Sequence, residues 1–280
     1  MTTAVRALFN RVSQVQISAA DRVQYGLIVA WVLAMIALPI LVWTLGDEVL
    51  PIAVTGALLV QCAAVLYSLS RTLHWQRLVA LFGVILLVTW TFEFVGSRYD
   101  IPFGAYDYTE RLQPKIAGVP LLVPLAWFMM LPSSWVVASL IVPQGRVWTS
   151  AAFVFISAAA MTAWDLFLDP QMVGWGFWIW DNPAQYGPVY FGIPFVNFAG
   201  WMLTASVATA LVRPWRFRLN AAPLLVIYGV TWFLETVGLA VFWGEPGPAL
   251  FGSLAMGLLL ILSVRAYLRE HHITIPGFYS

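Results

Sequence analysis

The sequence has few of the side chains on which redox and metal chemistry depend. Its 280 residues include one cysteine, Cys62, and three histidines, His74, His271 and His272. A single thiol excludes a disulfide framework and a cysteine-based cluster. The histidines lie at the polar ends of long apolar segments, away from the acids within those segments. This placement excludes a histidine box of the di-iron kind and a haem ligand beside those acids.

Charged residues are scarce as well. Only 10% of the residues are charged and 61% are hydrophobic, whereas soluble domains carry about 25% charged residues. The only lysine, Lys115, lies in a predicted loop, which excludes a retinal Schiff base within a helix. The net charge of +1 gives no indication of nucleic-acid binding. No glycine-rich phosphate or dinucleotide motif is present, and no metal or other cofactor is expected.

The chain consists largely of apolar runs of about 20 residues, each long enough to cross a bilayer as a helix. We therefore predict an all-α polytopic membrane protein with internal repeats. One transmembrane domain is expected over 23–270, between a cytoplasmic segment at 1–22 and a cytoplasmic tail at 271–280. The eight predicted spans are 24–45, 49–70, 77–97, 118–142, 148–168, 193–212, 221–243 and 248–268.

The distribution of basic residues predicts the orientation. Of the 14 basic residues, all but Arg98, Arg111 and Lys115 fall on the side of the two termini. The positive-inside rule therefore predicts cytoplasmic termini in the cell membrane. The outer loops 98–117 and 169–192 are long and rich in aromatic residues. Loops of this length are usually functional or disordered, and their aromatic content favours loops that fold over the outer face of the bundle.

Two sequence patterns occur twice. The stretch from Thr89 to Gly96 matches the stretch from Thr231 to Gly238 at five of eight positions, which include Trp90 with Glu93 and Trp232 with Glu235. The tripeptides Gly118-Val119-Pro120 and Gly192-Ile193-Pro194 are each followed by a tryptophan nine residues after the glycine, Trp127 and Trp201. Both patterns indicate an internal repeat of helices and loops.

Three acids lie within the predicted spans: Glu93, Asp165 and Glu235. A fourth, Asp169, shares a helix face with Asp165 at a helix end expected before Pro170. Intramembrane carboxyl groups mark functional interiors by default. Burial favours the neutral, proton-donating form of a carboxyl group, and an ionised neighbour is a base. The structural alternative is that these acids reach water at the helix ends or pair with Arg98.

Aromatic side chains surround these acids. Trp164, Tyr190 and Trp201 belong to a cluster around the loop 169–192, and Tyr106 and Tyr108 belong to the other long loop. An interfacial aromatic belt accounts for part of this enrichment. Aromatic faces also stabilise a developing carbocation, by about 2 kcal/mol or more when desolvated.

At two of these stretches the sequence resembles a known family, the membrane carotenoid 1,2-hydratases of the γ-carotene 1′-hydroxylase and bisanhydrobacterioruberin hydratase type. The stretches are FEFVGSRYDIPFGAYDYTERLQPKIAGVP at 92–120 and WDLFLDPQMVGWGFWIWDNPAQYGPVYFGIPFVNFAGW at 164–201. The resemblance implies addition of water to the terminal C1=C2 bond of an acyclic ψ-end carotenoid, such as lycopene or γ-carotene. It implies no redox cofactor, and membrane lipid as the surroundings.

The resemblance and the acid cluster together suggest a set of site residues. Glu93, Asp165, Glu235 and Asp169 are the catalytic candidates, and which of them donates the proton stays open. Arg98 is a candidate for holding one acid ionised. The candidates for positioning water or substrate are Tyr106, Tyr108, Asn197, Trp90, Trp164, Trp201 and Trp232. For Asn197, a hydrogen bond between helices is an equally good explanation.

Three alternatives remain at this stage. A lycopene-cyclase-like enzyme would protonate the same end group but exclude water. A membrane prenyltransferase is suggested by the spacing of Asp165 and Asp169, but the loop 169–192 holds no lysine or arginine for a diphosphate. A proton-coupled transporter or a carotenoid-binding protein without turnover would use the same acids without a chemical step.

Overall fold

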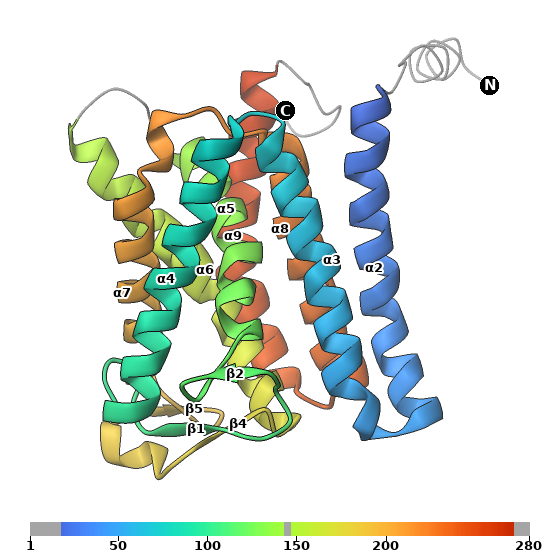
Figure 1. Ribbon diagram of the computed structural model, residues 1–280, viewed down its shortest axis with the longest axis vertical. Coiled ribbons are helices and arrows are strands. Elements are labelled where there is room, and N and C mark those ends of the chain that lie inside the picture. Colours follow the sequence, from blue (N-terminus) through green and yellow to red (C-terminus); the bar gives the residue numbers. More distant parts are fainter. Residues whose placement is uncertain (1–17, 143–146, 272–280) are drawn as a thin grey trace, which may run out of the picture.

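The computed structural model describes residues 18–142 and 147–271, and eight long helices run side by side in it as a bundle (Figure 1). The predicted all-α polytopic fold is therefore confirmed. The predicted terminal segments at 1–22 and 271–280 lie almost wholly outside the described residues. The helices are α2 (Ala19–Leu45), α3 (Leu50–Ser70), α4 (Trp75–Tyr99), α5 (Leu122–Ile141), α6 (Val147–Gly174), α7 (Phe195–Val212), α8 (Ala221–Val237) and α9 (Pro246–Glu270).

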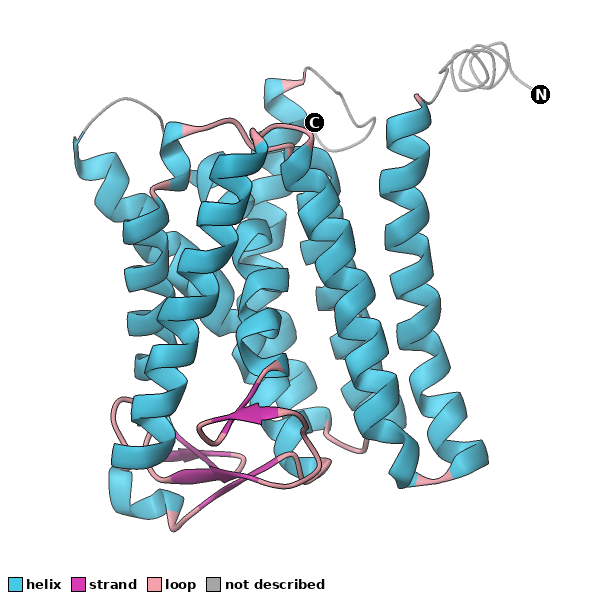
Figure 2. Cartoon of the chain, in the orientation of Figure 1, coloured by secondary structure: helices cyan, strands magenta, loops and turns pink. Residues whose placement is uncertain are grey.

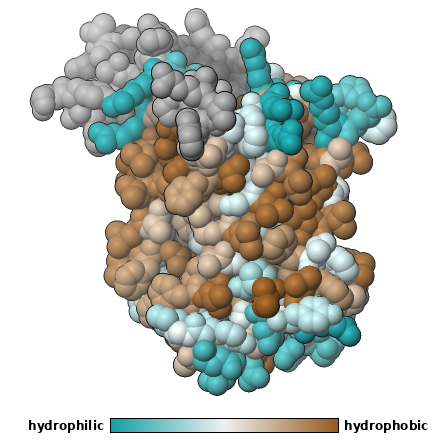
Figure 3. All heavy atoms as spheres, turned by 90° about the vertical axis from the view of Figure 1, so that its left-hand side faces the viewer, coloured by the Kyte–Doolittle hydropathy of each residue, from teal (hydrophilic) through white to brown (hydrophobic). Residues whose placement is uncertain are grey.

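Helix α5 is the centre of the bundle. It packs against α3, α4, α6, α8 and α9, and every residue from Trp127 to Ala138 is buried. The peripheral helices bury one face only and leave large apolar side chains such as Leu33 and Ile52 exposed on the other. Figure 3 shows the result as a hydrophobic belt between two more hydrophilic ends. This is the surface that a bilayer requires.

The two long loops cover one end of the bundle with short strands (Figure 2). β1 (Tyr106–Tyr108) pairs antiparallel with β4 (Trp178–Trp180) and so joins the two loops. The other strands form hairpins: β2 (Lys115–Ile116) with β3 (Val119–Pro120), and β5 (Val189–Tyr190) with β6 (Ile193–Pro194). The described ends of the chain lie at the opposite end of the bundle (Figure 1). The loops thus fold over the bundle, as expected from their aromatic content.

The two hairpins are copies of each other. Each turns through two residues with positive φ, Ala117-Gly118 in one and Phe191-Gly192 in the other, as type I′ turns require. In each, the residue after the second strand donates its backbone N–H to the carbonyl of the proline just before the first strand: Leu121 to Pro114 at 2.9 Å, and Phe195 to Pro188 at 3.0 Å. The predicted repeat is present in the backbone as well as in the sequence.

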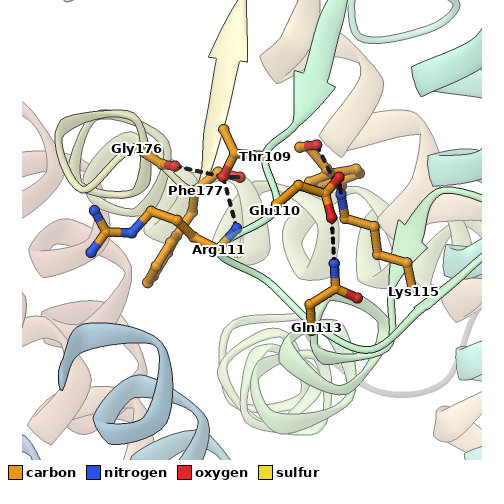
Figure 4. Close-up of polar contacts among 8 residues, drawn as sticks. Thr109, Glu110, Arg111, Gln113, Lys115, Gly176 and Phe177 are labelled. Atoms are coloured by element: carbon orange, nitrogen blue, oxygen red, sulfur yellow. Dashed lines mark hydrogen bonds and ion pairs between the residues drawn. The ribbon is translucent and has the colours of Figure 1, made fainter. Parts of the chain in front are cut away.

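Polar contacts between the loops hold this cap together (Figure 4). The Thr109 hydroxyl donates to the carbonyl oxygens of Gly176 (2.7 Å) and Phe177 (3.2 Å). The Lys115 ammonium donates to the Tyr108 carbonyl (3.1 Å) and to Glu110 (2.8 Å). The hydrogen bond and charge of Lys115 lower the pKa of the Glu110 carboxyl. Lys115 therefore anchors the strand that carries Tyr108.

Three helix boundaries beside the aromatic loops differ from the prediction. Helix α6 was predicted to end before Pro170 but continues to Gly174. Helices α5 and α7 begin at Leu122 and Phe195, after the hairpins, and not at 118 and 193. Helix α8 passes into a π-helical turn over Gly238–Phe242, which ends close to the predicted boundary at 243. Short apolar strands cannot be distinguished from a helix end by hydropathy alone, because both are apolar runs.

Candidate active site

Glu93 lies near the end of α4 and is buried, with 4% of its surface exposed. Its carboxylate accepts three hydrogen bonds. The Trp127 indole N–H donates to Oε1 (3.1 Å), and the hydroxyls of Tyr106 (2.6 Å) and Tyr108 (2.7 Å) donate to Oε2. Because an indole can only donate and donors favour the charged form of an acid, this arrangement is suited to a carboxylate.

The alternation of strand β1 positions both phenols. Tyr106 and Tyr108 are two residues apart and share the inner face, while Asp107 between them is exposed. Burial raises the pKa of both phenols well above the usual range, because desolvation and the nearby carboxylate oppose the phenolate form. Both hydroxyls are therefore donors at physiological pH.

Phe103 fixes the position of the loop that carries these phenols. Its ring is buried between Gly96 of α4 and Gly200 of α7, so closely that a Cβ atom on either glycine would overlap with it. The two glycines therefore form a slot for the ring. With Phe103 in this slot, Tyr106 lies within hydrogen-bonding distance of Glu93.

Asp165 and Asp169 of α6 form a second acidic group. The Asn197 amide, in the first turn of α7, donates to Asp165 (3.0 Å) and also to Asp169. Asp165 Oδ1 is buried and has no hydrogen-bond partner among the described residues. Two adjacent buried carboxyls cannot both ionise without a compensating cation, so this pair retains at least one proton.

The third acid, Glu235 of α8, is buried beside two side chains of α6, Trp164 and Gln171. Trp164 Nε1 has no hydrogen-bond partner among the described residues. Gln171 was not among the predicted site residues, because it follows Pro170 and was assigned to a loop. The helical continuation of α6 makes it a buried residue of the site.

One cavity of about 100 Å³ joins these groups. Glu93, Asp169 and Glu235 line it from α4, α6 and α8, and apolar and aromatic side chains make up most of the remaining wall. Trp178 and Trp180 of β4 close it on the loop side. Its described lining includes no lysine, arginine or histidine.

The structure brings most of the predicted site residues together. Asp165 lies behind Asn197 and does not line the cavity. The predicted site residues that line it are Glu93, Tyr106, Tyr108, Trp164, Asp169, Asn197, Trp201 and Glu235. Trp127 and Trp201, the tryptophans of the repeated pattern, stack with ring centroids 4.1 Å apart.

Three predicted residues lie elsewhere. Arg98 is exposed, and its guanidinium lies over the Phe94 ring at 5.9 Å. Trp90 donates to the Ile116 carbonyl (3.3 Å) and Trp232 to the Ser253 carbonyl (3.0 Å). The two tryptophans of the repeated helical pattern therefore tie each helix to its neighbouring segment and do not face the cavity.

The fold and the site together define the class of this protein. It is a polytopic helical membrane protein with buried acids around an apolar, aromatic cavity. Residues 53–260 match the family described as carotenoid biosynthesis protein, and the chain belongs to that family. This finding confirms the resemblance noted in the sequence.

One relative is bisanhydrobacterioruberin hydratase of Haloarcula japonica, 31% identical over 183 residues. The match covers 62% of this chain and 60% of that protein, so the chain spans less than two thirds of its relative. No solved structure matches the chain.

Proposed function

We propose that this protein hydrates an acyclic ψ-end carotenoid such as lycopene or γ-carotene. In this reaction water adds across the terminal C1=C2 bond and a tertiary alcohol forms. The observation that carries the proposal is one apolar cavity lined both by a carboxylate bound by three donors and by Asp169, a member of a carboxyl pair that retains a proton. The carotenoid biosynthesis family and the relative that is named a hydratase support the same chemistry.

Asp169 is the proton donor in this mechanism. It is the member of the Asp165–Asp169 pair that lines the cavity, and the Asn197 amide keeps the two carboxyls in position. The carboxyl proton of Asp169 is transferred to C2, the C1=C2 π electrons form the new C–H bond, and C1 becomes a tertiary cation. Asp165 is a positioning residue that shares the remaining charge.

Glu93 is the base. A water molecule attacks C1 and gives up one proton to the Glu93 carboxylate, so one water is consumed and one alcohol forms. The proton then returns from Glu93 to the aspartate pair, which restores both groups. General acid and base steps of this kind each contribute about 10²–10⁴-fold. Trp127, Trp178 and Trp201 line the cavity where the cation forms and stabilise it through their ring faces.

The rival functions are less well supported by this cavity. A cyclase would need the cation to be protected from water, yet Gln171 and Asn197 add polar groups to the wall. A prenyltransferase would need cationic side chains for a diphosphate, and the described lining has none. A carotenoid-binding protein would tolerate replacement of its acids by amides.

The test is expression in cells that accumulate lycopene, followed by mass spectrometry of the pigment. Hydration yields a product heavier by one water molecule, whereas cyclisation leaves the mass unchanged. A pigment of unchanged mass and altered absorption would identify a cyclase.

Glu93→Gln removes the base but preserves the shape of the side chain. We expect hydration to fall by about 10²–10⁴-fold while the protein is still produced in the membrane. Asp107→Asn is the matched control, because Asp107 lies between the two phenols but is exposed. Full activity of Glu93→Gln would show that Glu93 has no part in the chemistry.

A further inference from the structure

A second hollow opens beside the acid cavity, between α2 and α8. It has a volume of about 360 Å³. Ile36 and Ile40 of α2 form one rim, and Phe233 of α8 and Phe242 of the π-helical turn form the other. All four side chains are between 40% and 57% exposed and belong to the hydrophobic belt. The hollow, called the α2–α8 groove below, therefore faces the hydrocarbon of the bilayer.

The groove adjoins the acid cavity. Both are lined by Met35, Leu38, Gln171, Trp175 and Glu235. Glu235 and Gln171 thus lie at the boundary between the two spaces. A molecule in the groove therefore already contacts one of the three acids of the cavity.

The groove differs from the acid cavity in having one acid in its wall instead of three, and its backbone is irregular. Apart from Glu235 and Gln171, the wall of the groove is made of aliphatic and aromatic side chains with one proline and one glycine. The backbone is irregular on both sides, with Pro39 inside α2 and the π-helical turn Gly238–Phe242 after α8. Such turns occur often at functional sites. Trp43 and Phe242 meet edge to face at 5.5 Å and narrow the groove toward the loops.

The acid cavity alone is too small for a long polyene. At about 100 Å³ it holds a branched chain end, whereas an extended carotenoid is about as long as the hydrocarbon core is thick, about 30 Å. The remainder of such a substrate must leave the cavity through an apolar opening. The α2–α8 groove is apolar, opens to lipid and shares Glu235 with the acid cavity.

We propose that the α2–α8 groove binds the polyene chain of the substrate while its end group lies in the acid cavity. This inference rests on the proposed function for the identity of the substrate. It assigns α2 and the π-helical turn, for which the sequence indicated no role, to substrate recognition. It also makes Glu235 and Gln171 the residues that the chain passes on its way to the reacting acids.

The test uses a long and a short substrate to separate binding of the polyene chain from the chemical step. Ile40→Trp and Ile36→Trp each fill the groove, and Leu33→Trp places the same side chain about one turn before Ile36, at an exposed position of α2 that does not line the groove. Each purified variant is assayed with lycopene and with a ten-carbon acyclic hydrocarbon that carries the same dimethyl-alkene end. The short substrate needs the cavity but not the groove.

We expect the groove variants to lose about tenfold or more in kcat/KM for lycopene, a change of about 1.4 kcal/mol. Their activity on the short substrate should equal that of the wild type, and Leu33→Trp should resemble the wild type with both substrates. Thermal unfolding establishes that each variant is folded. If both groove variants hydrate lycopene as fast as Leu33→Trp does, the groove does not hold the chain.

A binding measurement distinguishes this inference from the proposed function. Lycopene retained by the detergent-purified protein is measured by its visible absorption. Retention by the wild type and loss in the groove variants supports the groove, even if no hydration occurs and the proposed function fails. If the groove variants retain lycopene fully, or if phospholipid occupies the groove without being displaced by lycopene, the inference is overturned.

Discussion

Glu93 and Glu235 occupy matching positions in two copies of one sequence pattern, but their surroundings differ. The threonine four residues before each acid bonds to its own helix in the same way, Thr89 at 2.8 Å and Thr231 at 2.9 Å. Glu93 accepts hydrogen bonds from two phenols and an indole of other elements, whereas Glu235 lines both the acid cavity and the groove. The pattern predicts burial of both acids, but it contains nothing about partners from distant segments.

At the residue scale, the phenols beside Glu93 predict a pH dependence. A free phenol titrates near pH 10, and the pKa values of Tyr106 and Tyr108 in the folded protein lie well above that. The stability that depends on the neutral phenols is therefore complete below about pH 10 and is lost as the pH rises toward the folded values. Thermal unfolding between pH 7 and 11 should show a steeper decline for the wild type than for Tyr106→Phe/Tyr108→Phe. Parallel curves would contradict this assignment.

The sequence located the acids better than it located their neighbours. Glu93 and Glu235 face one cavity, as their predicted intramembrane positions suggested. The third acid of the cavity is Asp169, at the predicted helix end, and not Asp165 within the predicted span, because the helical twist of α6 decides which of the two faces inward. Arg98 lies one helical turn beyond Phe94 and points to the surface. The direction in which each side chain points depends on how its helix is rotated about its axis. A helix that is apolar on all sides does not specify that rotation.

At the scale of elements, helix α6 shows how a proline is accommodated. Pro170 has no N–H for the carbonyl of Leu166, four residues earlier, and the Tyr190 hydroxyl donates to that carbonyl at 3.1 Å. The hairpin β5–β6 thus supplies the missing donor and allows the helix to continue. The sequence indicated a helix end at Pro170 because the compensating hydroxyl is 20 residues further along the chain.

This accommodation can be measured with a double-mutant cycle. Tyr190→Phe should lower the free energy of unfolding by about 0.5–1.5 kcal/mol, because the part-buried Leu166 carbonyl loses its donor. In the Pro170→Ala background the same change should cost less, since residue 170 then supplies the backbone N–H. Chemical unfolding in detergent gives the coupling free energy. Equal costs in both backgrounds would rule out this role for Tyr190.

The slot that Gly96 and Gly200 form around Phe103 is a second feature at the scale of elements. Gly96→Ala should displace the Phe103 ring and lower stability by about 1–3 kcal/mol through overpacking. It should also impair hydration, because Tyr106 would move away from Glu93. Gly83→Ala on the same helix is the control, since its Cβ would meet no atom within 4 Å, and it should be neutral or stabilising. Thermal unfolding and activity are measured for both variants. If Gly96→Ala is as stable and as active as Gly83→Ala, the two glycines do not hold the Phe103 ring in place.

At the scale of the whole molecule, the number of helices and the position of the loops were predictable from the sequence. Apolar runs of membrane length define eight helices, and the aromatic loops cover one end of them (Figure 1). The strands β1–β6 were not predictable, because pairs of two or three residues are too short for a period-2 pattern. Pairing of β1 with β4 also requires a contact between segments 70 residues apart.

The orientation in the membrane is a prediction of the positive-inside rule. Its test uses single cysteines in a Cys62→Ala background, with Asp181→Cys in the aromatic loop and Glu270→Cys at the end of α9, both exposed. A membrane-impermeant thiol reagent added to intact cells should label the first and spare the second. The reverse pattern would place the aromatic loops in the cytoplasm.

The paired strands β1 and β4 relate two of the acids to each other. Asp107 at the centre of β1 pairs with Ile179 at the centre of β4, and Glu93 and Asp165 each lie 14 residues before these partners. The internal repeat therefore extends from the hairpins to the acids of α4 and α6. The two units differ in what reaches the acid: phenols of β1 donate to Glu93, and the Asn197 amide donates to Asp165. One arrangement of helix, strand and hairpin thus gives two acids different surroundings.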